Sequence, residues 1–119
     1  MPDRLTAGQA LKPGQSITSG NGAFQLVLQT DGNLVLYATS THKSLFASNT
    51  AGDFAIGQAI MQGDGNFVLY DNSGKSVWES GTATTETHKI TIDPYVVVQD
   101  DGNVVIYATT NFWATNTNT

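Results

Sequence analysis

One set of five side chains occurs three times in the sequence with the same spacing. Each copy follows the pattern Gln-x-Asp-x-Asn-x-Val-x-Tyr, in the segments Gln29–Tyr37, Gln62–Tyr70 and Gln99–Tyr107. The two amides supply hydrogen-bond donors and acceptors, the carboxylate supplies acceptors, and the tyrosine supplies a hydroxyl. This set suits a ligand with adjacent hydroxyl groups and one apolar face, such as a sugar. It suits a phosphate badly, because a carboxylate stands where a cation would be needed.

Turn chemistry is the alternative explanation for any single copy. Asp-Gly-Asn is common in tight turns, where the Asp side chain bonds nearby backbone and glycine accommodates a positive φ. A turn does not, however, require Gln four residues before Asn or Tyr four residues after it. Six of the nine positions are identical in all three copies, and they include the whole set. The repetition therefore favours binding over a purely structural role.

The motif belongs to a longer repeat. Each copy is followed by an aromatic residue and a small polar tail, in Phe46–Thr50, Trp78–Thr82 and Trp113–Thr117. Three such units fill the chain from about residue 15 to its end and leave a short N-terminal strand region. The length of 119 residues fits one domain, so we expect a single domain over residues 1–119.

Each motif is predicted to form a β-hairpin. Strand-favouring residues such as Phe24–Leu28 flank the Asp-Gly dipeptides, and no stretch has a sustained helical period. A two-residue loop at Asp-Gly would leave both faces half polar. A three-residue loop, Thr30–Gly32, pairs Gln29 with Asn33 and puts glycine at the left-handed position that such loops require. We therefore predict the three-residue loop in all three hairpins.

This loop sorts the side chains of each hairpin onto two faces. One face carries the recurring polar set, and the other is wholly apolar. The apolar positions are Leu26, Leu28, Leu34 and Leu36; Ala59, Met61, Phe67 and Leu69; and Val96, Val98, Val104 and Ile106. The apolar residue types vary between copies while the polar set does not, which again favours a function for the polar face.

Composition excludes several classes of protein. Ten acidic against five basic residues give a net charge of −5, which argues against nucleic acid or an anionic membrane as a partner. The absence of cysteine excludes disulfides, zinc–thiolate sites and iron–sulfur clusters. No apolar run approaches the ~20 residues of a membrane span. The segment Met1–Thr6 lacks the apolar stretch of a secretory signal. That favours a cytoplasmic chain or one released without a signal, the alternative being a secreted protein whose signal has been removed.

The three motifs and their tails resemble the monocot mannose-binding lectins of the bulb-lectin type, from about Leu5 to Thr117. The resemblance implies an all-β, β-prism II fold with three four-stranded antiparallel sheets in pseudo-threefold symmetry. It implies a lectin that binds mannose and mannose-rich glycans without a metal ion or other cofactor. It also implies one shallow pocket per motif, in which Asp and Asn bond the 2-hydroxyl, Gln the 3-hydroxyl and Tyr the 4-hydroxyl, while Val packs on the ring. The implied pocket residues are Gln29, Asp31, Asn33, Val35 and Tyr37; Gln62, Asp64, Asn66, Val68 and Tyr70; and Gln99, Asp101, Asn103, Val105 and Tyr107.

Three departures from the plant pattern stand out. Gly32 and Gly57 occupy the positions of the two half-cystines usual in plant members, and Phe46 stands where Trp is usual. The interval between the second and third motifs is four residues longer than the interval between the first and second, and the longer stretch lies around Gly81–Lys89. Phe46, Trp78 and Trp113 are the candidates for the aromatic centre that joins the sheets in this family, and we assign them core packing.

Catalytic chemistry is not expected. His42 and His88 lie in polar connections without a serine elbow or metal-type spacing. Asp31, Asp64 and Asp101 are equivalent positions in different repeats, so a threefold fold keeps them too far apart for a glycosidase pair. The Asp-Gly-Asn loop also lacks the oxygen ligands and final Glu of a calcium loop. The alternative to a lectin is a structural or protein-interaction domain whose sugar pockets are vestigial.

The resemblance also implies an assembly. In this family the C-terminal strand is exchanged between two chains, and Asn111–Thr117 suits that role. We expect a homodimer, or a dimer of dimers.

Overall fold

The computed structural model of the chain describes residues 3–52, 55–81, 94–107 and, as backbone, 111–114. Every regular element in these residues is a β-strand. The strands are β1 (Arg4–Thr6), β2 (Ala10–Leu11), β3 (Ser16–Thr18), β4 (Phe24–Leu28), β5 (Leu34–Ala38), β6 (Lys43–Ala47), β7 (Ile56–Met61), β8 (Phe67–Asp71), β9 (Ser76–Glu79), β10 (Tyr95–Val98), β11 (Val104–Tyr107) and β12 (Asn111–Ala114). Within the described ranges, no helix is long and apolar enough to cross a membrane.

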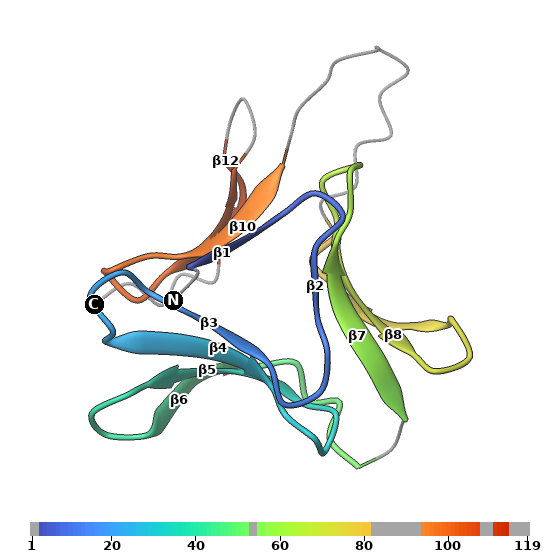
Figure 1. The fold of residues 1–119 in the computed structure, drawn as a ribbon, viewed down its shortest axis with the longest axis horizontal. Coiled ribbons are helices and arrows are strands. Elements are labelled where there is room, and N and C mark those ends of the chain that lie inside the picture. The colour runs from blue at the N-terminus through green and yellow to red at the C-terminus, as the bar shows by residue number, and fades with distance from the viewer. Residues whose placement is uncertain (1–2, 53–54, 82–93, 108–110, 115–119) are drawn as a thin grey trace.

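The strands form three four-stranded sheets that surround a common centre (Figure 1). The first sheet has the order β3-β4-β5-β6, the second β2-β7-β8-β9 and the third β1-β10-β11-β12. The strand pairs that define these orders are antiparallel. Each sheet thus contains one motif hairpin, one outer strand from the tail that follows it, and one N-terminal strand. This confirms the all-β prediction of three four-stranded antiparallel sheets.

The three-residue loop is confirmed in all three hairpins. In the first, the Gln29 N–H donates to the Asn33 carbonyl at 2.9 Å, and the Gly32 N–H donates to the Gln29 carbonyl at 3.0 Å. The equivalent bonds close the second and third turns. Gly32, Gly65 and Gly102 have φ of 93°, 92° and 87°, in the region that glycine adopts without steric cost. The register that follows places Leu28 opposite Leu34.

The predicted apolar faces form the core. All twelve residues predicted for these faces are at most 1% exposed. They pack in one cluster between the sheets, together with Phe24, Ile56 and one residue from each N-terminal strand. Because the inner face of each sheet packs against the core, the polar set lies on the outer face.

The N-terminal region has more structure than the sequence analysis predicted. It forms three short strands, and each joins a different sheet. Leu5, Leu11 and Ile17, six residues apart, are buried at 6%, 3% and 1% exposure. Gly8 and Gly14, both with φ of 90°, turn the chain from one sheet to the next. These apolar and glycine positions each recur every six residues. The spacing indicates three short strands, and the sequence analysis, which followed the longer repeats, did not use it.

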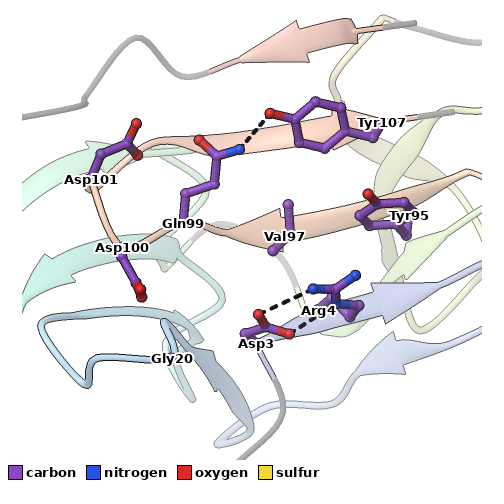
Figure 2. A pocket seen from close by; sticks show the side chains of 9 residues that line it. All are labelled: Asp3, Arg4, Gly20, Tyr95, Val97, Gln99, Asp100, Asp101 and Tyr107. Atoms are coloured by element: carbon purple, nitrogen blue, oxygen red, sulfur yellow. Dashed lines mark hydrogen bonds and ion pairs between the residues drawn. The ribbon is translucent and has the colours of Figure 1, made fainter. Parts of the chain in front are cut away.

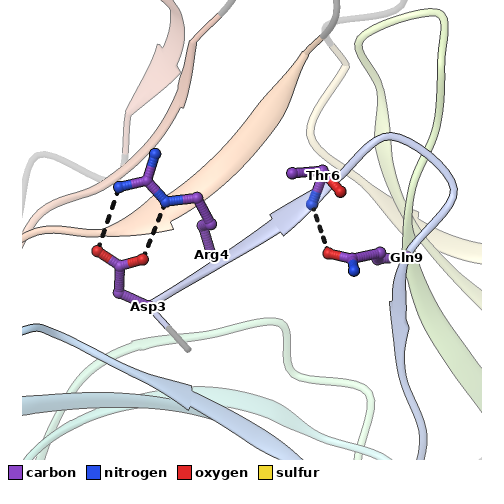
Figure 3. Close-up of polar contacts among 4 residues, drawn as sticks. All are labelled: Asp3, Arg4, Thr6 and Gln9. Carbon is purple, nitrogen blue, oxygen red and sulfur yellow. Dashed lines mark hydrogen bonds and ion pairs between the residues drawn. The ribbon is translucent and has the colours of Figure 1, made fainter. Parts of the chain in front are cut away.

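The two turns between these strands are closed in the same way. The side-chain carbonyl of Gln9 accepts from the Thr6 N–H at 2.9 Å (Figure 3). Gln15 accepts from the Lys12 N–H at the same distance. The N-terminal segment therefore acts as a connector that completes all three sheets.

Two of the three predicted central aromatic residues pack as expected. The rings of Phe46 and Trp78 meet edge to face with centroids 5.7 Å apart, and Phe67 meets Trp78 at 6.4 Å. Phe46 and Trp78 are partly buried against the core cluster. The side chain of Trp113 and the interval 82–89 lie outside the described residues.

Candidate functional site

The recurring set occupies equivalent places in the three sheets. The Gln residues follow β4, β7 and β10, the Asp residues lie in the turns, and the Asn residues precede β5, β8 and β11. The Val and Tyr residues are the second and fourth residues of those same strands. The fold therefore brings each set together on the polar face of one hairpin and places the three sets on three different sheets.

Gln and Tyr are hydrogen-bonded in every copy. The Gln62 Nε2 donates to the Tyr70 Oη at 2.5 Å, and the Gln99 Nε2 donates to the Tyr107 Oη at 2.5 Å. The Gln29 Nε2 donates to the Tyr37 Oη in the first sheet. Because the tyrosine oxygen accepts this bond, its own proton is left to be donated elsewhere. The pair thus presents an amide and an oriented hydroxyl across two strands.

The carboxylate has a structural role as well. In each turn an Asp Oδ1 accepts the backbone N–H of the Asn two residues later at 2.9 Å. This is the turn chemistry that the sequence offered as an alternative explanation. The same bond holds the Asp carboxylate beside the Asn amide. The hydrogen bond that closes the turn therefore also positions the carboxylate to accept a hydrogen bond from a ligand.

The tails determine which way the Asn amides point. The Asn33 Oδ1 accepts from the Ser48 Oγ at 3.0 Å and from the Asn49 N–H at 2.9 Å. In the second sheet the Asn66 Oδ1 accepts from the Ser80 Oγ at 3.0 Å and the Gly81 N–H at 3.1 Å. A backbone N–H can donate only to the amide oxygen, so these bonds fix the amide orientation. The NH₂ group, with its two donors, faces away from the tail.

Ser48 and Ser80 are positioning residues that the sequence analysis missed. The Ser48 Oγ also accepts the Leu34 N–H at 3.0 Å, and the Ser80 Oγ accepts the Phe67 N–H at 3.0 Å. Each serine thereby joins the Asn side chain to the start of the central strand. The signal was available, because the tails contain Ser, Ser and Thr at this position. The third of these, Thr115, lies outside the described residues.

The residue after this serine has a left-handed backbone, which yields a test. Asn49 has φ of 60° and Gly81 has φ of 75°. We expect Asn49→Val to lower the free energy of unfolding by about 1–2 kcal/mol, because a branched side chain is strained in this region. Asn49→Gly is the matched control and should change it by less than about 0.5 kcal/mol. Equal effects of the two variants in urea denaturation would contradict this explanation.

The valines of the three motifs, expected to pack on a sugar ring, are nearly inaccessible to solvent. Val35, Val68 and Val105 are 3%, 2% and 1% exposed. Each lies on a central strand between two neighbours; Val35, for example, pairs with Val27 and Ala47. They form the apolar floor of the site and offer a ligand only a small surface.

A cavity of about 480 Å³ lies over the third sheet (Figure 2). It is lined by Asp3, Arg4, Gly20, Tyr95, Val97, Gln99, Asp100, Asp101 and Tyr107. The motif contributes Gln99, Asp101 and Tyr107, whereas β1 and the residue before it contribute the opposite wall. Below, this is called the third-sheet cavity.

The opposite wall contains an ion pair. The Arg4 Nε lies 2.9 Å from the Asp3 Oδ1, and the Arg4 Cζ lies 5.0 Å from the centroid of the Tyr95 ring. The hydrogen bond from Arg4 lowers the pKa of Asp3, and the same bond raises the pKa of Arg4. Both groups are therefore charged at neutral pH.

A second cavity, of about 460 Å³, lies over the second sheet. It is lined by Lys12, Gly57, Gln58, Tyr70, Asp71, Asn72 and Gly74. Hydrogen bonds from Ser73 and from the Lys75 N–H lower the pKa of Asp71. A Cβ at Gly57 would lie 2.9 Å from the Asn72 Oδ1, so a larger residue there would require the Asn72 side chain to shift. Of the second motif, this cavity includes Tyr70.

Metal-ligating side chains do not cluster in the part of the chain that the structure describes. Among the described residues, no three His, Cys, Asp or Glu side chains are close enough together to hold a metal ion. His42 is exposed in the turn between β5 and β6, with φ of 58°. His88 lies outside the described residues. Asp31, Asp64 and Asp101 lie on separate sheets, as predicted.

Three antiparallel sheets around one core, each with a polar set on its outer face, define a β-prism protein of the lectin class. Comparison with solved structures supports this class. Monomeric monocot mannose-binding lectins from Gastrodia elata match with a TM-score of 0.84 and 35% identity, over 98% of this chain and 99% of that chain. The snowdrop (Galanthus nivalis) mannose-specific agglutinin matches with a TM-score of 0.76 and 36% identity, over 98% of both chains.

Sequence comparison gives a shorter match. The B-type lectin plumieribetin of Scorpaena plumieri is 32% identical over 79 residues, and the match covers 66% of each protein. No model of a protein family matches the sequence. The likeness to Gastrodia and snowdrop lectins extends over nearly the whole chain. The chain therefore belongs to the monocot mannose-binding lectin family of the bulb-lectin type, and it has the β-prism II fold.

Proposed function

We propose that this protein binds mannose-containing glycans at three shallow sites, one per sheet, without catalysis and without a metal ion. The observation that carries the proposal is the fixed orientation of the polar set. Gln and Tyr are hydrogen-bonded in all three sheets, and the tails orient the Asn amide in the two sheets where they are described. The snowdrop agglutinin, whose structure is a complex with methyl-α-D-mannoside, supports mannose as the sugar.

The proposed recognition follows from the donors and acceptors. In the first site, the NH₂ group of Asn33 donates to the 2-hydroxyl and the carboxylate of Asp31 accepts from it. Gln29 bonds the 3-hydroxyl, and Tyr37 bonds the 4-hydroxyl. The axial 2-hydroxyl distinguishes mannose from glucose, and the equatorial 4-hydroxyl distinguishes mannose from galactose. The equivalent residues of the second and third motifs act in the same way.

Weak binding of single sugars is expected. A shallow site with a few hydrogen bonds corresponds to a Kd of roughly 1 mM, or about −4 kcal/mol. Simultaneous occupation of several sites by one branched glycan can raise the apparent affinity by ~10²–10⁴. We therefore infer that multivalent glycans are the physiological ligands.

Titration with sugars followed by amide NMR tests the proposal. Methyl α-mannoside should shift the amide signals of Gln29, Gln62 and Gln99 with millimolar Kd, while galactose at the same concentration should not. If mannoside shifts none of these signals at tens of millimolar, the lectin proposal fails. That result would favour the alternative, a protein-interaction domain with vestigial pockets.

We also propose a homodimer, or a dimer of dimers, formed by exchange of the C-terminal strand. In the single chain, β12 pairs with β11 in its own sheet, with Ile106 opposite Trp113. A strand exchanged from a second chain would occupy this same position. The Gastrodia lectins, by contrast, are monomeric.

Truncation tests the exchange. The full chain should have the mass of a dimer or tetramer in light scattering, and a chain ending at Tyr107 should be a monomer, because the exchanged strand is gone. Circular dichroism of the truncated chain would show that the remaining strands are folded. An unchanged mass after truncation, or a monomeric full chain, would refute strand exchange.

A further inference from the structure

We propose that the third site extends beyond its motif into a subsite for a second, uncharged sugar residue, formed by Asp3, Arg4 and Tyr95. This inference rests on the proposed mannose binding at Gln99–Tyr107. It adds that the third site favours a disaccharide over a single sugar. The subsite also distinguishes the third site from the first and second sites, which have the same motif.

The first argument is the continuity of the cavity. The third-sheet cavity of about 480 Å³ is lined by the motif residues Gln99, Asp101 and Tyr107 together with Asp3, Arg4 and Tyr95. Figure 2 shows Tyr107 on β11, Val97 and Tyr95 on the adjacent β10, and Arg4 on β1 beyond it. The register confirms this order, since Val97 pairs with both Val105 and Arg4. One open hollow thus runs across three neighbouring strands.

The second argument is the chemistry of the far wall. A guanidinium has five N–H donors, of which Asp3 accepts two, at 2.9 and 3.3 Å. The Asp3 carboxylate keeps further lone pairs after accepting these bonds. The ion pair therefore offers both donors and acceptors with no net charge, which suits the hydroxyl groups of a neutral sugar.

Charge argues against an acidic sugar at this place. Asp3 balances Arg4, while Asp100 and Asp101 add two carboxylates to the same lining. Like charges that face each other across an interface weaken binding, so these carboxylates would repel a sugar that carries a carboxylate or a phosphate group. We therefore assign a neutral hexose.

The third argument is the comparison with the other sheets. The strand position of Arg4 is occupied by Ala10 in the second sheet and Ser16 in the first. The position of Tyr95, opposite the motif tyrosine, is occupied by glutamine in both. In the first sheet Gln25 donates to the Ser16 Oγ at 2.9 Å, and in the second Gln58 accepts from the Lys12 Nζ at 3.1 Å. The cation and the aromatic ring thus occur together in the third sheet.

Within this wall, the Asp3–Arg4 pair is suited to substitution because both side chains are partly exposed to solvent. The Asp3 and Arg4 side chains are 32% and 47% exposed. Exposed ion pairs between neighbouring residues contribute little to stability. Arg4→Ala should therefore leave the melting temperature unchanged. Tyr95→Gln introduces the residue that the other two sheets carry.

The experiment is a set of NMR titrations of the full chain that follow the amides of Val97 and Gln99. The probes are methyl α-mannoside and the α1,2-, α1,3- and α1,6-linked mannobioses. We expect at least one mannobiose to bind the third site about tenfold more tightly than methyl α-mannoside, as two added hydrogen bonds would give. Arg4→Ala and Tyr95→Gln should reduce this advantage to less than about threefold, while Lys43→Ala, which removes an exposed cation of the first sheet, should keep it.

The outcomes separate the subsite from the proposed function. If methyl α-mannoside shifts Gln99 but no mannobiose binds more tightly, the subsite is refuted and the lectin proposal stands. Equal weakening of methyl α-mannoside and mannobiose by Arg4→Ala would likewise refute it, because Arg4 would then act through the motif. If methyl α-mannoside itself does not bind, the proposed function fails. Tighter binding of mannose 6-phosphate than of mannose at this site would overturn the assignment of a neutral sugar.

Discussion

Replacing Phe67 with alanine is expected to lower the free energy of unfolding by about 3–5 kcal/mol. Phe67 is 1% exposed, faces Met61 across the second hairpin and meets the Trp78 ring at 6.4 Å. Truncation removes the ring from the core cluster and leaves a cavity there. Because the interior is close-packed, neighbouring side chains can fill that cavity only in part.

Urea denaturation followed by circular dichroism measures this loss. The matched control is Ile60→Ala on the neighbouring strand, since Ile60 is on the polar face and only partly buried. We expect the control variant to lower the free energy of unfolding by about 1 kcal/mol. Similar losses for the two variants would show that the core does not lie on the predicted face.

Replacing Asn33 with alanine is expected to abolish sugar binding at the first site and to leave the second and third sites intact. The variant removes the NH₂ donor group proposed to bond the sugar. It also removes the acceptor of bonds from Ser48 and Asn49, which costs about 1–3 kcal/mol of stability where the donors stay buried. The other two sites keep their affinity because they lie on separate sheets.

Asn33→Asp separates the two roles of this side chain. A carboxylate can still accept from Ser48 and Asn49 but offers no NH₂ donor. We therefore expect this variant to keep most of the stability and still lose binding at the first site. NMR titration with methyl α-mannoside, following the amides of Gln29, Gln62 and Gln99, measures binding at each of the three sites. Loss of binding at all three sites would contradict independent sites.

The hairpins and their core faces could be predicted from the sequence because both depend on local chemistry. A glycine at the left-handed position, three residues after Gln, selects the loop length, and loop length sets the register. Register then determines which side chains share a face, since alternate residues point to opposite sides of a strand. Leu26 and Leu28 were assigned to the core by this argument, and both are buried.

The partners of the polar set could not be predicted in this way. Ser48 contacts Asn33 across a separation of 15 residues, and Ser80 contacts Asn66 across a separation of 14. Such contacts follow from how sheets are assembled, not from local propensity. The burial of Val35 is a similar case, because a neighbouring strand on each side of β5 covers it.

The sequence by itself determined that there are three equivalent hairpins, which face is apolar and which polar side chains recur, because turn chemistry and the two-residue period of a strand act within a few residues. The tertiary structure decided how these parts differ. The N-terminal segment contributes one strand to each sheet, and the residue opposite Val97, Ile60 or Val27 differs from sheet to sheet. Arg4 therefore lies beside the third motif, while Ser16 and Ala10 lie beside the other two. Pairing of each N-terminal strand with a strand later in the chain, as far apart as Arg4 and Val97, gives the three recurring sets different surroundings.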